Sequence, residues 1–322
     1  MLQLTKRGIF SPEGKFTIDG RNPKGINIVT HGHTDHLKSG SKLYLATPET
    51  CSIIKSRFKK AQVQELRYGK QITIENTKVS LHPAGHVLGS AQVRIESGNN
   101  ISVVTGDYKR QPDPTCKPFE LVKCHTLITE ATFGHPVYEW PEENLVLNSA
   151  AFWIKKNQKE NITSIIHCYS LGKAQRILTE LEARGIKKIY VQESIETFNH
   201  TYRKHGHKLA NAHSLNKAKV GSVIMLSSKS ELELEGEKEE AYFSGWALPT
   251  SEKKWFSSKR GFVISDHADF PTLIKTALES EAKQVLTMHG YTRELSHELR
   301  KLGLESSPFE QPKMQHLIEQ FL

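Results

Sequence analysis

A dense group of histidine and aspartate side chains, directly after a short apolar segment, constrains this chain more than any other feature. Residues 26–29 are mostly β-branched and predict a buried strand, and the loop after them contains His31, His33, Asp35 and His36. Side chains at these mixed spacings cannot share one face of a strand or helix, but from a loop they can converge. Because imidazole and carboxylate groups bind divalent metals, the group predicts a metal site at a strand end. The alternative is a solvated loop that is merely rich in histidine, and further ligands along the chain decide between the two.

Three more polar residues stand where an apolar segment gives way to a glycine-containing loop. They are His86, Asp107 and His289. Strand ends from distant parts of a chain can meet at one rim of a sheet, so we expect these side chains to join the first group. A structural role in a loop is the alternative for each of them taken alone.

These donors predict two divalent ions. The ligands expected for the first ion are His31, His33 and His86. The ligands expected for the second are Asp35, His36 and His289. Asp107 can bridge the two ions, because a carboxylate has two oxygens to share, and two ions about 3.5–4 Å apart activate a bridging hydroxide. The histidine-rich donor set favours Zn²⁺, while the carboxylates also admit Mn²⁺.

The composition favours a globular protein with a polyanionic partner. The chain has 322 residues, of which 37% are hydrophobic and 25% charged, so it can bury a large core. Its formal net charge of +9 fits nucleic acid as a partner, with ordinary lysine-rich solubility as the alternative. Four scattered cysteines and the absence of an apolar secretory segment predict a reduced, cytoplasmic protein. No stretch has the apolar length of a membrane span, so no membrane is expected as a partner.

The pattern of apolar segments divides the chain into three sections. Residues 1–140 are dominated by short strands, residues 141–257 alternate strands with helices, and residues 258–322 return to strand ends that carry histidine. Strand–helix alternation is typical of a parallel α/β unit, so we expect an α/β domain inserted into a β-rich one. The acidic stretch at residues 231–240 predicts solvated surface, and residues 262–265 predict a strand that opens the last section.

The ligand pattern resembles a known fold. His-x-His-x-Asp-His, followed by a later histidine, an aspartate and another histidine, is similar to the metallo-β-lactamase αββα sandwich. The α/β insertion before the Asp-His-Ala-Asp segment that contains His267 resembles the β-CASP nucleases of that fold. The resemblance therefore implies an α/β protein, a metallo-β-lactamase sandwich with an inserted β-CASP domain. Within it, Asp19 matches an aspartate that orients ligand histidines, and Glu130 matches the acidic residue closing the last strand before the insertion.

Longer segments resemble one bacterial branch, the ligase-associated DNA exonucleases. They are residues 83–93, 106–109, 112–116, 171–176, 243–246 and 289–292. This resemblance implies a DNA exonuclease of DNA repair that leaves 5′-phosphates, with a DNA ligase and a helicase as associated partners. The eukaryotic crosslink-repair nucleases typically carry valine at the position of His289, whereas the RNA-cleaving members carry histidine. An RNA-processing nuclease of the same fold is therefore the alternative, and a small-molecule metallohydrolase is disfavoured by the insertion and the basic charge.

In phosphodiester hydrolysis, each of the candidate catalytic side chains would have a distinct role. Asp35 and Asp107 would hold the ions that activate a hydroxide, which attacks phosphorus while the metals offset charge on the non-bridging oxygens. His267, held by Glu130, is suited to protonate the leaving oxygen, because imidazole titrates near working pH. A buried structural histidine is the alternative for His267.

Small and basic residues near two strand ends predict contacts with phosphate. Ser170, Gly172 and Lys173 lie where a strand enters a helix, and backbone N–H groups at a helix start bind phosphate. Lys109, directly after the segment that ends at Asp107, could follow a nucleic-acid backbone. The basic aromatic segment 253–256 could do the same and stack a base. An ordinary helix start and a packed aromatic residue are the respective alternatives.

Overall fold

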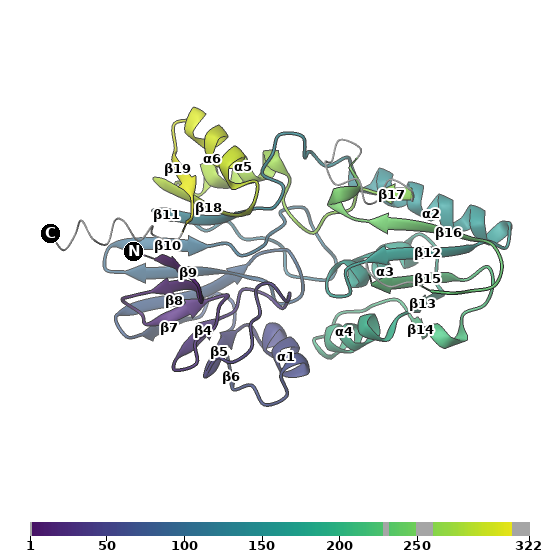
Figure 1. Cartoon of the computed structure of the whole chain (residues 1–322), viewed down its shortest axis with the longest axis horizontal. Coiled ribbons are helices and arrows are strands. Elements are labelled where there is room, and N and C mark those ends of the chain that lie inside the picture. Colours follow the sequence, from purple (N-terminus) through teal and green to yellow (C-terminus); the bar gives the residue numbers. More distant parts are fainter. Residues whose placement is uncertain (1, 228–231, 249–259, 311–322) are drawn as a thin grey trace.

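The computed structural model describes residues 2–227, 232–248 and 260–310, which form two halves side by side (Figure 1). One half contains the N-terminus and two sheets, and the other half contains a third sheet with its own helices. Among the helices of these residues, none combines the length and the apolar character needed to cross a membrane.

The first sheet contains six strands in chain order. They are β1 (Gln3–Thr5), β2 (Gly8–Ser11), β3 (Phe16–Ile18), β4 (Ile26–Ile28), β5 (Leu43–Ala46) and β6 (Val63–Glu65). Strands β1 to β3 are antiparallel, and β3 to β6 run parallel. Strand β4 is the buried strand predicted before the histidine loop, so this loop begins at the carboxyl end of a parallel strand.

The second sheet runs in the order β19-β18-β11-β10-β9-β8-β7. Its strands are β7 (Gln71–Ile74), β8 (Thr77–Pro83), β9 (Ala91–Ser97), β10 (Asn100–Val104), β11 (Thr126–Ala131), β18 (Gln284–Gly290) and β19 (Glu305–Pro308). Strand β18 pairs in parallel with β11, although the whole third sheet separates them in the chain. This pairing places Glu130 opposite Met288, the residue before His289. Two distant strand ends therefore meet at one rim.

A hydrophobic core fills the space between the first two sheets and packs them against each other. Ile18 contributes from the first sheet and Val93 from the second, and both are fully buried. Burying a side chain of this size contributes about 1.5–3 kcal/mol. Helix α1 (Pro48–Arg57) packs against the first sheet, and helices α5 (Phe270–Glu279) and α6 (Thr292–Lys301) pack against the second.

The third sheet runs in the order β14-β13-β15-β12-β16-β17, and each of its strand pairs is parallel. Its strands are β12 (Thr163–Cys168), β13 (Ile189–Val191), β14 (Ala212–Ser214), β15 (Val223–Ser227), β16 (Lys238–Phe243) and β17 (Arg260–Phe262). Among the described residues, it is accompanied by helices α2 (Glu143–Lys159), α3 (Lys173–Ala183) and α4 (Glu193–Lys204). The parallel α/β arrangement expected from strand–helix alternation is confirmed.

One sequence prediction near this sheet is wrong, and a second holds only in part. The strand expected at residues 262–265 is instead β17, which ends at Phe262 and pairs with β16, so it extends the third sheet and does not open the last section. The acidic stretch at residues 231–240 is not all solvated surface, because Glu239 and Glu240 lie in β16 and contact Trp153 and His167. Residue 231 and the expected boundary between residues 257 and 258 lie outside the described residues.

A small apolar cluster connects the two halves beside the histidine loop. It contains Ile53 of α1, Leu88, Leu171 and Tyr202 of α4. The hydroxyl of Tyr202 also accepts a hydrogen bond from the backbone N–H of Leu88 at 3.1 Å. These contacts fix α1 against α4 and leave the histidine loop between the two halves.

Candidate metal centre

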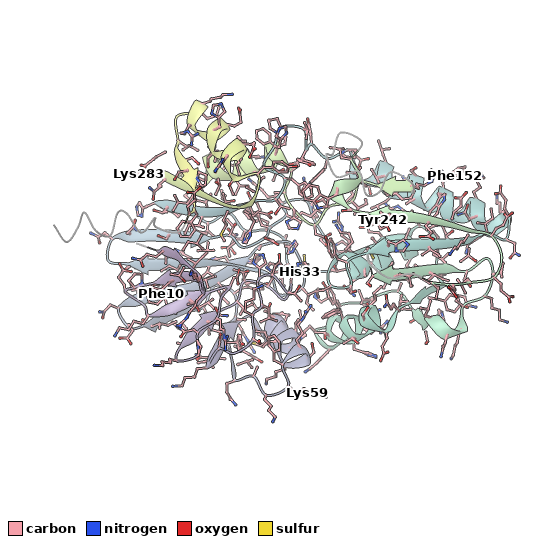
Figure 2. All side chains as sticks on the ribbon, viewed as in Figure 1. Phe10, His33, Lys59, Phe152, Tyr242 and Lys283 are labelled. Carbon is pink, nitrogen blue, oxygen red and sulfur yellow. The ribbon has the colours of Figure 1, made fainter. Side chains whose placement is uncertain are left out.

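The histidine loop lies at the junction between the two halves, where His33 is labelled in Figure 2. It follows β4, while His86 follows β8 and Asp107 follows β10. His31 and His86 are almost completely buried. Residues from separate strand ends therefore meet at one point, as the sequence predicts.

The close approach of two of these segments depends on a glycine. Gly106 precedes Asp107 and has a φ of +56°. A Cβ at this position would lie only 2.7 Å from the Cβ of Thr30, the residue before the first histidine of the loop. A larger residue would therefore push Asp107 away from the histidines.

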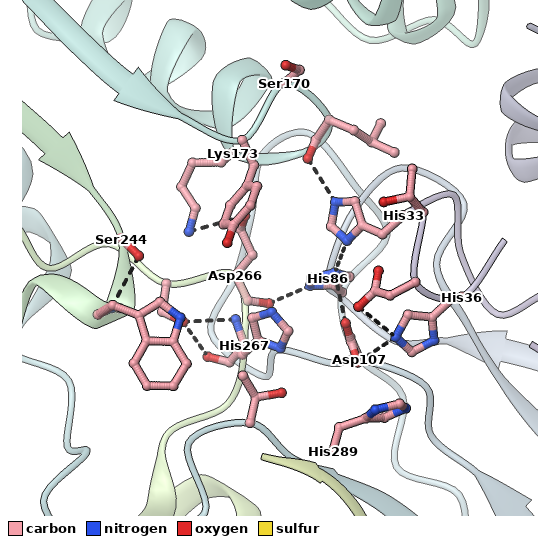
Figure 3. Close-up of a pocket in the computed structure, with 18 of the residues that line it drawn as sticks. His33, His36, His86, Asp107, Ser170, Lys173, Ser244, Asp266, His267 and His289 are labelled. Atoms are coloured by element: carbon pink, nitrogen blue, oxygen red, sulfur yellow. Dashed lines mark hydrogen bonds and ion pairs between the residues drawn. The ribbon is translucent and has the colours of Figure 1, made fainter. Parts of the chain in front are cut away.

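The inward ring nitrogens of His31, His33 and His86 face one another. Figure 3 shows the contact between His33 and His86. Nε2 of His31 and Nε2 of His86 each lie 3.1 Å from Nδ1 of His33. One oxygen of Asp107 lies 3.5 Å from Nε2 of His31 and 3.8 Å from Nε2 of His86. Nitrogens that bind one zinc ion at about 2.0–2.1 Å are separated by about 3.3 Å in a tetrahedral site. The spacing therefore fits a single ion held by all three rings.

In His33 and His86, the hydrogen bond made by the outward-facing ring nitrogen fixes which nitrogen carries the proton. Nε2 of His33 lies 3.1 Å from the carbonyl oxygen of Leu171, and Nδ1 of His86 lies 2.8 Å from that of Asp266. A carbonyl oxygen only accepts, so each outward nitrogen must donate its N–H. The inward nitrogens are then left with free lone pairs, which is the state a metal ligand needs.

A single carboxylate orients two more rings. Oδ2 of Asp19 accepts from the hydroxyl of Thr30 at 2.6 Å and from Nδ1 of His36 at 2.7 Å. Because the Thr30 hydroxyl donates to Asp19, its oxygen is free to accept from Nδ1 of His31, 3.1 Å away. Asp19 therefore directs Nε2 of both histidines toward the centre.

A second group of donors shares Asp107 with the first. Nε2 of His36 lies 3.3 Å from Oδ1 of Asp107 and 3.7 Å from a carboxylate oxygen of Asp35, which is largely exposed. These three residues offer donor atoms that all lie within 4.8 Å of one another. His289, expected as a further ligand, stands apart from this compact group, with its ring centroid 5.2 Å from that of His36.

The protonation states of the buried rings agree with metal ligation. Burial lowers the pKa of His31 and His86 well below the ordinary value and keeps both rings neutral. Burial also acts to lower the pKa of His36, but the carboxylates of Asp107 and Asp19 outweigh it and raise this pKa. The neutral rings of His31 and His86 are ready to bind a metal, whereas His36 would release its proton when an ion binds at its Nε2. The imidazoles and carboxylates together offer the donor types that two divalent ions sharing Asp107 would use.

A separate acid–base pair lies beside this centre. Nδ1 of His267 lies 2.9 Å from Oε2 of Glu130, and Oε1 of Glu130 accepts from the backbone N–H of Tyr108 at 2.7 Å. Burial lowers the pKa of His267, but the carboxylates of Glu130 and Asp107 outweigh this effect and raise it to about 9. His267 is thus a proton donor at neutral pH, with its ring centroid 4.7 Å from that of His86.

Six charged side chains form a buried ion network behind His86 and His267. The members of this network are Lys109, Asp113, Glu143, Lys173, Arg176 and Asp266. Arg176 is fully buried, and its guanidinium contacts all three carboxylates and the carbonyl oxygen of Ser265. The network ties helices α2 and α3 to the segment that carries Asp266 and His267.

Three of the four nucleic-acid contacts expected from the sequence are not available on the protein surface. Lys109 is 1% exposed and its ammonium lies 3.2 Å from Glu143, while Lys173 is 3% exposed and lies 3.2 Å from Asp266. The backbone N–H of Gly172 donates to the side chain of Gln175. Contacts within the protein therefore already occupy the two ammonium groups and the N–H of Gly172. Of the four expected residues, Ser170 still has a side chain that could contact phosphate. The aromatic segment 253–256 lies outside the described residues.

A cavity of about 520 Å³ opens between the two halves in front of the metal centre. Asp35, Asp107 and His267 line it, so three of the four expected catalytic residues face one bound substrate. Glu130, the fourth, is buried behind His267 and contacts its ring. Sequence reasoning missed several other lining residues, namely Arg57, Tyr169 and Phe198. None of them follows the pattern of an apolar strand and then a polar ligand, so the sequence offered no signal for them.

Comparisons with known proteins support a nuclease family. A probable DNA ligase of Opitutus terrae is 28% identical over 309 residues, which cover 93% of this chain but 30% of that protein. The DNA cross-link repair 1A protein of Mus musculus is 26% identical over 53% of this chain and 17% of its own length. RNase aCSPSF2 of Saccharolobus solfataricus is 28% identical over 37% of this chain and 24% of its own. The resemblance to the β-CASP metallo-β-lactamase nucleases is confirmed.

The remaining comparisons concern the fold and the length of the match. This chain spans less than a third of each of these three relatives. A crystal structure of an Enterococcus faecalis protein of unknown function superposes with a TM-score of 0.58, at 13% identity, over 89% of this chain and 80% of that one. This similarity concerns the fold alone. No family model matches the chain.

Proposed function

We propose that this protein is a metal-dependent nuclease that degrades DNA from an end during DNA repair. The observation that carries the proposal is the convergence on one cavity of two donor groups that share Asp107 and of a proton donor, His267. The names of the relatives, which include a DNA ligase and a DNA cross-link repair protein, support DNA as the substrate.

The chain's own residues have distinct tasks in this proposal. His31, His33 and His86 would hold one divalent ion. Asp35, His36 and His289 would hold the second, and Asp107 would be shared between the two. When bound, the two ions, Zn²⁺ or Mn²⁺, activate water and offset the negative charge of the scissile phosphate.

His267 completes the reaction as the general acid. Glu130 holds its Nδ1, so the other ring nitrogen, Nε2, can transfer a proton to the O3′ leaving group. The P–O3′ bond breaks, the proton from His267 completes the 3′-hydroxyl, and the phosphate stays on the 5′ oxygen of the nucleotide after the cut, which is the outcome that the family resemblance implies. The cavity volume suits one or two unstacked nucleotides, which supports cleavage at a strand end.

We also propose the wider organisation of the protein. Residues 1–140 and 258–322 would form one αββα metallo-β-lactamase unit around the inserted β-CASP domain, whose last strand extends the insertion to Phe262. A cytoplasmic location and association with a DNA ligase and a helicase complete the proposal.

An RNA-processing nuclease is the second candidate. The histidine at position 289 resembles the RNA-cleaving members, and one relative is named as an RNase. Single-stranded DNA and RNA of the same sequence, each labelled at the 5′ or the 3′ end and incubated with Zn²⁺ or Mn²⁺, separate the two. We expect stepwise shortening of DNA from one end. Cleavage of RNA alone would refute the DNA assignment, and internal cuts that do not depend on an end would refute the exonuclease.

A further inference from the structure

The cavity in front of the metal centre continues along the contact between helices α1 and α4. Arg57 ends α1, while Ser194 and Phe198 belong to α4, and all three line the cavity. Tyr169 lines the same region and is 50% exposed. This part of the cavity has no role in holding metal ions or in proton transfer.

The position of Arg57 relative to the metal centre is fixed by close packing. Ile53 lies one helical turn before Arg57 and packs against Gly32 of the histidine loop so tightly that a Cβ on Gly32 would lie 2.7 Å from it. The backbone of Arg57 therefore lies about 6 Å along the α1 axis from Ile53, the residue that contacts this loop.

In the part of the chain that the structure describes, Arg57 lacks the carboxylate partner that Lys173, which also lines the cavity, has in Asp266. Among the described residues it makes no ion pair, its Nε is buried without a hydrogen-bond partner, and its guanidinium lies 5.4 Å from the ring centroid of Phe198. Burial lowers its pKa, and no carboxylate offsets this effect. Arg176 shows the opposite arrangement, with three carboxylates around it. A partly buried guanidinium without an anion favours an anionic ligand.

We propose that Arg57 binds a backbone phosphate of the strand held in the cavity, at a subsite separate from the scissile phosphate. The guanidinium fork can donate two hydrogen bonds to phosphate oxygens, and the hydroxyls of Ser170 and Ser194 lie on the same side of the cavity. The exposed ring of Tyr169 offers a surface on which the adjacent base stacks. The inference rests on the proposed nuclease function and identifies which protein group holds the strand.

Two substrates and a matched control test the subsite. Arg57→Gln removes the charge, Arg57→Lys keeps it, and Lys55→Gln removes an exposed charge from the same helix. Each variant is assayed with a single-stranded DNA oligonucleotide and with bis(p-nitrophenyl) phosphate, which is too small to reach both sites. Binding of the fluorescent oligonucleotide is measured separately by anisotropy in chelator at several salt concentrations.

We expect Arg57→Gln to raise KM and Kd for the oligonucleotide about 10- to 100-fold, with bis(p-nitrophenyl) phosphate hydrolysis unchanged. The slope of log affinity against log salt falls by about 0.7, and Arg57→Lys recovers part of the loss. Equal behaviour of Arg57→Gln and Lys55→Gln would overturn the subsite, as would equal loss on both substrates. If the unsubstituted protein hydrolyses neither substrate, the proposed function fails, and anisotropy still decides the subsite.

Discussion

Replacing Arg176 by methionine tests the buried ion network most sharply. Methionine fills much of the same volume but has no charge, so it leaves Asp113, Glu143 and Asp266 facing one another. Arg176 lies 3.1 Å from Asp266 and donates to the carbonyl oxygen of Ser265 at 2.8 Å, and its side chain is fully buried. The remaining cations, Lys109 and Lys173, each contact only one of the three carboxylates.

The expected cost follows from this burial. Removing one partner of a buried ion pair costs about 3–5 kcal/mol, because the other charges stay buried without compensation. With a denaturant slope of about 3 kcal/mol/M, the urea midpoint falls by about 1–2 M. The network also positions Asp266, whose carbonyl oxygen accepts from His86. The folded variant should therefore bind metal about tenfold more weakly or worse.

Urea unfolding followed by tryptophan fluorescence measures the first effect, and competition with a chromophoric chelator measures the second. Arg184→Met is the matched control, because Arg184 directly follows the same helix and its ion pair with Glu180 is partly exposed. This control should lose less than about 1 kcal/mol. Adding Asp113→Asn to Arg176→Met should recover part of the loss. A cost for Arg176→Met within about 0.5 kcal/mol of zero would refute the reasoning.

Three further predictions concern the site itself. Asp107→Ala should abolish hydrolysis with circular dichroism unchanged, because both donor groups lose their shared ligand; an active variant would exclude a bridging role. Glu130→Gln should move the basic limb of the pH–kcat profile to lower pH, because the protonated form of His267 is present below a pKa of about 9 and the lost carboxylate raises that pKa. Glu120→Gln, which removes the partner of His82, is the control, and equal profiles for the two variants would contradict the assignment. Thr30→Val should weaken metal binding about tenfold in chelator competition, because His31 loses the acceptor that fixes its proton; unchanged affinity would exclude this relay.

The convergence of the candidate metal ligands was predictable because they share a local signal. Each follows a short apolar strand, and strand ends from distant parts of a chain can meet at one rim, so His31, His86 and Asp107 could be placed together without coordinates. The partner of His267 was reached only through family resemblance, because Glu130 lies 137 residues earlier in the chain. No sequence pattern near either residue indicates that Glu130 and His267 lie in contact.

The basic residues were not predictable, because their environment is set by distant contacts. Lys109 and Lys173 have the sequence context of phosphate ligands, yet carboxylates from α2 and from the segment of Asp266 neutralise them. Arg57 has the context of an ordinary helix end, yet it lines the cavity. In the same way, β16 looked like solvated acidic surface, because the contacts of Glu240 with His167 form only when the third sheet assembles.

Metal titration of the depleted protein tests the central claim most directly. The protein is stripped with chelator, and release of labelled nucleotides from single-stranded DNA is followed as Zn²⁺ or Mn²⁺ is added back. Two donor groups that share Asp107 predict no release without metal and a plateau at two equivalents per chain. Full activity of the stripped protein, a plateau at one equivalent, or no release after two equivalents would contradict a dinuclear nuclease at this site.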